Sequence, residues 1–291
     1  MTYTLENSFL SLTVESKGAE IVSLKNQEGT ERIWTAQPEY WDRHAPLLFP
    51  CVGGNWEGLI RVNGTPYALP KHGFVQDMEF EVTEQSKDHL TLTVCDTEET
   101  RKCYPFPFRL SVSYTIYEQE VRVGWKVESP SSTDLPFMIG AHPAFLIPDF
   151  QTTDTLHGYL FFPQVEELIS TPTLPKGFTH PDQKECFALE DHLLPLTNEA
   201  FLCDTILDIR GQVSFVRLLD TQRSPVAEMQ FDMPVLALWS PAGGCAPFVC
   251  IEPWCGLCDT EDYRGEWSER PFMNHAEGLA AWEKSYTIRI Y

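Results

Sequence analysis

Residues 110–127 read LSVSYTIYEQEVRVGWKV, and this stretch decides the fold class. Every second residue is apolar on both sides of the polar pair Glu118-Gln119, namely Leu110, Val112, Tyr114, Ile116, Val121, Val123, Trp125 and Val127. A period of two in two runs joined by a short polar turn is typical of a β-hairpin that buries one face. The stretch therefore predicts an antiparallel hairpin.

Further runs of strand length recur along the chain. They lie at Leu10–Glu15, Ile21–Lys25, Phe80–Glu84, Leu90–Cys95, Val213–Leu219, Val226–Phe231, Val235–Trp239, Phe248–Ile251 and Tyr286–Tyr291. Turn-forming pairs such as Glu28-Gly29 and Asn63-Gly64 stand between such runs. So many strands without a flexible linker predict one all-β domain over residues 1–291, built as a large antiparallel β-sandwich.

Helices are expected to be few and short. The 22 prolines interrupt nearly every segment that is long enough for a helix, and proline lacks the backbone N–H that a helix interior needs. At most a turn or two is expected near Pro38–Asp42 and in Thr197–Asp204. The proline-rich stretch Thr152–Leu196 predicts long loops with short strands and not a domain boundary.

Composition excludes several classes of partner. The formal net charge of −21 argues against binding to nucleic acid or to an anionic membrane. The sequence has no long apolar run, and its N-terminus lacks the charged segment followed by an apolar segment that marks an export signal. We therefore expect neither an export signal nor a membrane span. Nine cysteines, an odd number without framework spacing, favour a reducing compartment over a disulfide scaffold. We therefore expect a cytoplasmic protein.

Three cysteines lie close together near the C-terminus, at Cys250, Cys255 and Cys258. The last two form a C-x-x-C pair, but a zinc knuckle needs a second pair of ligands, and Cys245 is the only further thiol nearby. A redox motif would need a βαβ context, which the pattern does not predict. The simpler interpretation is three small apolar residues, because free cysteine is among the most buried residue types.

Four short motifs carry the chemistry of this sequence. They are Pro46–Pro50 (PLLFP), Lys71–Phe74 (KHGF), Gly140–Pro143 (GAHP) and Cys250–Trp254 (CIEPW). In the last two, His142 and Glu252 each stand directly before a proline, which favours extended backbone. Since proline lacks the N–H of a central ladder, both are expected near a strand end or a sheet edge, where a pocket could open.

A histidine and a carboxylate placed in this way suit proton transfer. A structural interpretation stays open for each. His142 could be a buried histidine satisfied by a backbone carbonyl, and Glu252 could pair with an arginine or a backbone N–H. His72 and Arg43 are weaker candidates, because either could equally have a local structural role. No hydrolase nucleophile elbow, phosphate-binding loop, dinucleotide fingerprint or zinc-protease motif is present.

Taken together, these motifs resemble the aldose 1-epimerase (galactose mutarotase-like) superfamily, and most closely its branch of bacterial LacX-like proteins. The resemblance begins at Gly18–Leu24, runs through the four motifs in order, and ends at Ser285–Ile288. It implies a galactose mutarotase-like β-sandwich with a sugar-binding cleft on a concave face. It also implies an enzyme that interconverts α and β anomers of a small sugar without cofactor or metal.

The resemblance assigns roles by motif. Glu252 matches the general base and His142 the general acid of the family. His72 matches a second histidine that helps to hold the sugar, while Asp204 and Arg43 match sugar-binding residues less closely. An ordinary glutamate is ionised at neutral pH, so Glu252 is expected to keep His142 protonated.

One position bears on the substrate. Relatives that act on hexose 6-phosphates have an arginine two residues after the His-Gly-Phe motif, where this chain has Gln76. A free hexose is therefore the favoured substrate. A non-catalytic sugar-binding protein and a hexose-6-phosphate 1-epimerase remain alternatives, and a monomer or weak dimer is the default expectation.

Overall fold

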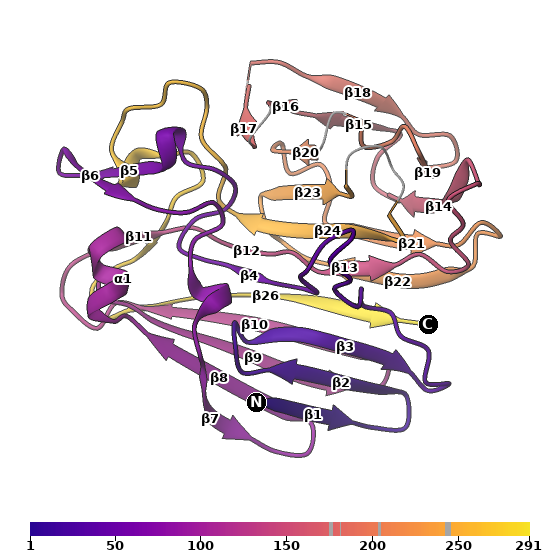
Figure 1. Cartoon of the computed structure of the whole chain (residues 1–291), viewed down its shortest axis with the longest axis horizontal. Helices are drawn as coiled ribbons and strands as arrows, with labels where there is room; N and C mark the ends of the chain where they lie inside the picture. Colours follow the sequence, from indigo (N-terminus) through magenta and orange to yellow (C-terminus); the bar gives the residue numbers. More distant parts are fainter. Residues whose placement is uncertain (175–176, 181, 203–204, 242–245) are drawn as a thin grey trace.

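The computed structural model describes residues 1–174, 177–180, 182–202, 205–241 and 246–291. Antiparallel sheets dominate it, and the expected large antiparallel β-sandwich is confirmed. The long strands β8 (His89–Cys95), β9 (Arg109–Tyr117), β10 (Glu120–Glu128) and β26 (Ala281–Ile290) form one broad layer. Strands β24 (Phe248–Cys255), β12 (Ile139–Ala141) and β4 (Leu47–Leu48) lie in a second layer above it in the view of Figure 1. Within the described residues, no helix is long and apolar enough to cross a membrane.

The larger sheet has nine strands, and every pair of neighbours is antiparallel. Across the sheet they are β19 (Leu193–Thr197), β14 (Leu156–Phe161), β21 (Phe215–Leu219), β22 (Pro225–Gln230), β26 (Ala281–Ile290), β10 (Glu120–Glu128), β9 (Arg109–Tyr117), β8 (His89–Cys95) and β7 (Glu81–Gln85). The predicted hairpin is β9–β10, in which Leu110 pairs with Val127 and Ile116 with Val121. Its apolar residues are buried and alternate with less buried polar ones.

The second sheet has six strands and carries the site. They are β20 (Ile206–Asp208), β23 (Val235–Trp239), β24 (Phe248–Cys255), β12 (Ile139–Ala141) and β4 (Leu47–Leu48) in order, with β13 (Ala144–Leu146) also paired to β24. All eight residues of β24 are buried. Alternate residues of this strand fall into two apolar clusters, because Val249 and Ile251 join the main core while Phe248 and Cys250 join a smaller cluster around Trp34.

Smaller sheets complete the fold. They are β1 (Thr2–Glu6), β2 (Leu10–Glu15) and β3 (Glu20–Asn26), and the two-stranded ribbons β5 (Leu59–Val62) with β6 (Thr65–Ala68), β11 (Leu135–Phe137) with β25 (Asn274–Ala276), β15 (Glu167–Ser170) with β18 (Glu185–Ala188), and β16 (Thr173–Leu174) with β17 (Phe178–Thr179). Short 3₁₀ turns lie at Trp56–Gly58, Val75–Asp77 and Trp267–Glu269. The main core extends from Leu5 to Ile290. The single domain stays a prediction, which this continuous core supports.

All nine further runs coincide with strands, although β24 and β26 are longer than expected. No helix forms at the two positions where at most a turn or two was expected, because residues 38–40 and 198–202 form turns and Thr197 ends β19. The one α-helix among the described residues, α1 (Glu98–Cys103), was not expected. Its six residues are too few for a readable period, and it depends on a capping box between Thr97 and Thr100.

Candidate active site

His142 and Glu252 meet in the six-stranded sheet. Glu252 lies within β24, and His142 directly follows β12. The register of β12 and β13 against β24 places the two residues opposite each other. Nε2 of His142 lies 3.2 Å from Oε2 of Glu252, and the two residues are only 8% and 1% exposed. The two side chains that the sequence singled out for proton transfer are therefore in contact, out of bulk water.

The predicted position at a sheet edge is wrong for Glu252, because β24 has neighbours on both sides. The break in strand pairing that allows a proline at position 253 lies inside the sheet. On one side of β24 the partner is split into β12 and β13, and the Ile251 N–H donates to the Pro143 carbonyl at this split, at 3.3 Å. Alternate residues of a strand direct their N–H groups to the same side. The missing N–H of Pro253 therefore faces the break after β12.

Both side chains line a pocket of about 320 Å³. Trp41, Trp239 and Trp254 form much of its apolar wall. The Trp41 ring stacks on the His142 imidazole with centroids 4.8 Å apart, and the Trp239 ring meets it edge-on at 5.7 Å. These rings fix the plane of the imidazole and exclude water from it. Trp34 packs in the cluster with Phe248 and does not line the pocket.

Burial changes the protonation of His142. It lowers the pKa of His142 to about 3, and the charge of Lys71 acts in the same direction, against a smaller opposing influence of the backbone of His142. The expectation that Glu252 keeps this imidazole protonated at neutral pH is therefore wrong for the free pocket. The physical reason is that the desolvation free energy of a buried imidazolium exceeds its electrostatic attraction to the neighbouring carboxylate.

His72 lies in the same pocket, beside His142. Its ring meets the His142 ring edge-on, with centroids 5.6 Å apart. The Gly53 N–H donates to Nδ1 of His72 at 3.1 Å, so the remaining proton of the neutral ring is on Nε2. Burial, with the nearby His142 and Lys71, holds the pKa of His72 well below its ordinary value. A neutral ring in this position can donate one hydrogen bond from Nε2.

The backbone geometry at position 73 explains why the His-Gly-Phe motif has a glycine there. Gly73 has a φ of +75°, and a Cβ at this position would lie 1.9 Å from the Phe49 carbonyl oxygen. That same oxygen accepts the N–H of Phe74 at 3.0 Å. The Pro46–Pro50 motif therefore supports His72 through backbone contacts, and its residues Pro46 and Leu48 also line the pocket.

Arg43 lines the pocket but is already paired. Its guanidinium donates to Asp77 Oδ1 at 2.9 Å and to the Gln76 carbonyl at 3.3 Å. Partial burial raises the pKa of Asp77, but the hydrogen bonds and positive charges of Arg43 and Lys17 together outweigh this and leave the pKa below its ordinary value. Asp77 was missed from the sequence, where it looked like an ordinary surface acid. Asp204, the remaining predicted binding residue, lies outside the described residues.

Sequence reasoning also missed part of the rim. Lys71 lines the pocket with its side chain exposed, and a Cβ on Gly177 would lie 3.4 Å from its Nζ. Gly177, which also lines the pocket, therefore lies close to the Lys71 side chain. The adjacent His72 was the only signal that could have drawn attention to Lys71. These contacts depend on segments about a hundred residues apart.

The three clustered cysteines do not form one site. Cys250 faces the smaller apolar cluster, Cys255 belongs to the main core on the other side of β24, and Cys258 lines the pocket beside Gly53. All three are free thiols and buried. This agrees with the interpretation of three small buried residues, which the sequence favoured over a zinc knuckle.

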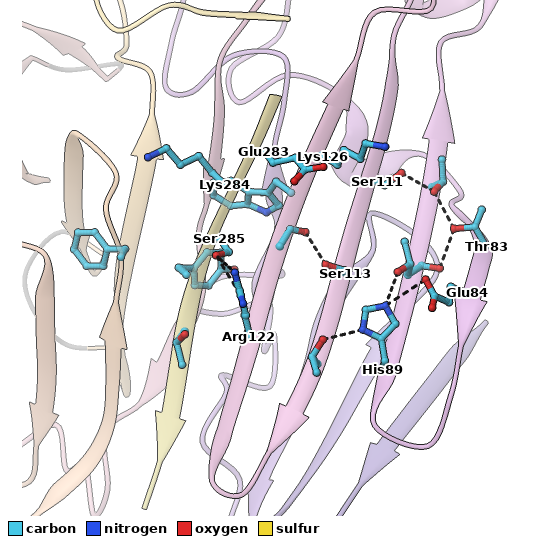
Figure 2. A pocket seen from close by; sticks show the side chains of 18 of the residues that line it. Thr83, Glu84, His89, Ser111, Ser113, Arg122, Lys126, Glu283, Lys284 and Ser285 are labelled. Atoms are coloured by element: carbon cyan, nitrogen blue, oxygen red, sulfur yellow. Dashed lines mark hydrogen bonds and ion pairs between the residues drawn. The ribbon is translucent and has the colours of Figure 1, made fainter. Parts of the chain in front are cut away.

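A larger hollow of about 980 Å³ lies on the polar face of the nine-stranded sheet (Figure 2). Its groups largely satisfy one another. His89 contacts the hydroxyls of Thr91 and Thr115, and Arg122 donates to Ser285. Among its described residues, no buried acid–base pair comparable to His142 and Glu252 is present. The smaller pocket is the better candidate for chemistry.

Known proteins place the chain in a family. A family model described as aldose 1-epimerase matches residues 1–262. The chromosomal protein LacX of Lactococcus lactis subsp. lactis is 29% identical over 299 residues, covering 100% of this chain and 99% of LacX.

Solved structures agree with this match. A galactose mutarotase related enzyme from Lactobacillus acidophilus is 30% identical with a TM-score of 0.93, covering 100% of this chain and 97% of that one. A galactose mutarotase-like protein from Lactobacillus casei ATCC 334 is 26% identical with a TM-score of 0.91, and the match covers 100% of both chains. The LacX-like resemblance is confirmed, and the chain belongs to the aldose 1-epimerase family.

Proposed function

We propose that this protein is a cofactor-independent aldose 1-epimerase that interconverts the α and β anomers of a free aldose, with Glu252 as base and His142 as acid. The observation that carries the proposal is the 3.2 Å contact between these two buried side chains in an aromatic-walled pocket. In keeping with the acidic composition, we propose a cytoplasmic protein whose partner is a small sugar and neither nucleic acid nor a membrane, and which is a monomer or weak dimer.

Ring opening needs a proton to leave the anomeric hydroxyl and a proton to reach the ring oxygen. The low pKa of His142 makes a stored imidazolium unfavourable in the free pocket. We propose instead that one proton moves through the pair. Glu252 takes it from the anomeric hydroxyl, passes it to Nε2 of His142, and the transient imidazolium delivers it to the ring oxygen. Rotation about C1–C2 and the reverse transfers give the other anomer.

The remaining pocket groups suit a polyhydroxylated ring. Nε2 of His72 is free to donate, because Nδ1 accepts the Gly53 N–H. The buried Nε1–H of Trp254 has no hydrogen-bond acceptor within the described part of the chain, so a sugar hydroxyl could accept it. The indole rings of Trp41 and Trp239 add apolar lining that could contact the C–H groups of a sugar.

Free aldoses are favoured because Gln76 is uncharged and the charge of Arg43 is offset by Asp77. A hexose 6-phosphate is the second candidate. It is favoured by one observation, the exposed Lys71 at the pocket rim, which forms no ion pair with any described residue.

Polarimetry tests the proposal. Wild type should accelerate mutarotation of freshly dissolved α-glucose or α-galactose, and Glu252→Gln should lower that acceleration by roughly 10²–10⁴-fold, the usual contribution of a positioned base. Glu228→Gln is a matched control, because Glu228 lies on β22 of the other sheet and pairs with Arg217. A wild-type rate equal to buffer for every hexose and pentose would refute the proposal. Sugar binding by calorimetry without acceleration would establish the non-catalytic alternative, and comparing glucose with glucose 6-phosphate decides the substrate class.

A further inference from the structure

Cys250 lies beside the acid–base pair, although the proposed reaction does not use it. It is two residues before Glu252 on β24, so both side chains project from the same face of the strand. One donor atom each of His142, Cys250 and Glu252 lie within 4.8 Å of one another. All three residues are buried, and the thiol is fully so.

These three donors match the coordination chemistry of zinc. Thiolate sulfur, imidazole nitrogen and carboxylate oxygen are its usual protein ligands, and three of them with one open position form the common arrangement in solvent-accessible sites. Ligands of a tetrahedral zinc are about 3.3–3.6 Å apart at ordinary bond lengths. The Nε2–Oε2 distance of 3.2 Å already fits, and a sulfur distance of at most 4.8 Å needs to shorten by roughly 1.2 Å to reach the upper end of that range.

Charge balance favours such a centre. A thiolate, a carboxylate and a neutral imidazole carry two negative charges, which cancel those of Zn²⁺ and leave a buried centre with no net charge. Binding releases the thiol proton to solvent. The imidazole ligates through Nε2 and keeps its proton on Nδ1. Since His142 and Glu252 line the pocket, a metal can reach the three donors through it, and water from the pocket can supply a fourth ligand.

We propose that His142, Cys250 and Glu252 form an inhibitory site for Zn²⁺ or a similar thiophilic divalent cation. The bound metal occupies the Glu252 oxygen and the Nε2 lone pair of His142, so neither can carry the proton between sugar oxygens. The inhibition rests on the proposed epimerase activity, whereas the binding does not.

A Co²⁺ titration of tag-free protein tests binding independently of activity. Wild type should take up one Co²⁺ with an intense thiolate-to-cobalt charge-transfer band, and Cys250→Ala should lose that band. Cys258→Ala is the matched control and should keep it, because Cys258, like Cys250, is a buried free thiol but lies outside the triad. Cys250→Ser, which keeps the side-chain size, repeats the test should the alanine variant not fold. No band in wild type, or an equal band in both Cys250 variants, overturns the site.

Inhibition is measured on the same proteins by polarimetry. Zn²⁺ should stop the wild-type enzyme and a chelator should restore it. In Cys250→Ala the half-inhibiting Zn²⁺ concentration should rise at least about tenfold, relative to the metal-free rate of that variant, because even the loss of a ligand's supporting partner weakens metal binding by 10–100-fold. An unchanged concentration refutes inhibition through this site. If metal-free protein shows no epimerase activity, the proposed function fails while the cobalt spectrum still decides the metal site.

Discussion

Arg270 should be one of the most costly residues to remove. It is 4% exposed, and its Nε lies 2.8 Å from Asp259 Oδ1 in an ion pair that is buried on both sides. The same guanidinium donates to Asn55 Oδ1 at 2.7 Å and to the Leu257 carbonyl at 2.9 Å. Asp259 also accepts the Trp56 N–H at 2.7 Å. The pair therefore ties residues 55–56 to the segment that follows β24, close to the pocket wall.

Arg270→Ala leaves the Asp259 carboxylate buried without its cation. Removing one partner of a buried ion pair costs about 3–5 kcal/mol. An unfolding entropy of about 2 cal mol⁻¹ K⁻¹ per residue over 291 residues converts this into a fall in melting temperature of about 5–8 °C. Arg270→Lys keeps the positive charge but cannot make all three contacts of the guanidinium. Its melting temperature should lie between those of the wild type and the alanine variant.

The pH dependence shows whether the loss is electrostatic. Burial raises the pKa of Asp259 in wild type, although Arg270 opposes this, so removing Arg270 should raise the pKa further. A raised carboxyl pKa means that the folded state holds its proton more readily, and stability falls as pH rises from the unfolded value through the folded one. The destabilisation of the variant should therefore be smaller at about pH 5 than at about pH 7 in urea unfolding. A loss under about 1 kcal/mol, or one independent of pH, would refute the reasoning.

Three further outcomes are expected. Gly73→Ala should cost well over about 2 kcal/mol in thermal unfolding, because its Cβ would meet the Phe49 carbonyl. Gly29→Ala, at a similar φ of +80° but with no atom within 4 Å, should cost only about 1–2 kcal/mol, and equal losses would contradict the steric argument. Gln76→Arg should raise the rate with glucose 6-phosphate relative to glucose by about tenfold, the effect of roughly one favourable charge contact, and an unchanged polarimetric ratio would count against this position as a substrate selector. NMR should show the His72 ring still neutral at about pH 6.5, where an ordinary imidazole is half protonated, because its pKa is held well below that value, and half-protonation there would contradict this.

The local alternation of apolar and polar residues was enough to predict most of the strands. The period of two in Leu110–Val127 gave the β9–β10 hairpin, since a strand that buries one face must alternate. Helix α1 escaped because six residues leave no period to read. The prediction that Glu252 lies at a sheet edge was wrong. Pro253 requires only that no carbonyl be paired to its backbone nitrogen, and the split between β12 and β13 meets this requirement inside the sheet.

The candidate site divides in a similar way. His142, Glu252 and His72 could be selected from the sequence, because proline and glycine beside a titratable residue restrict the backbone locally. Asp77 and Lys71 could not be given a role, since Asp77 matters through its ion pair with Arg43 and Lys71 through its position beside Gly177 at the pocket.

The sequence by itself determined the fold class, the family and the residue types available for proton transfer, because these depend on local periodicity and on motifs in order. Only the tertiary structure decided that His142 touches Glu252, that the imidazole is neutral in the free pocket, and that Cys250 lies within reach of both. The physical reason is that distance and dielectric surroundings are set by segments remote in sequence. Trp41 and β24 are some two hundred residues apart, yet together they exclude water from the same ring.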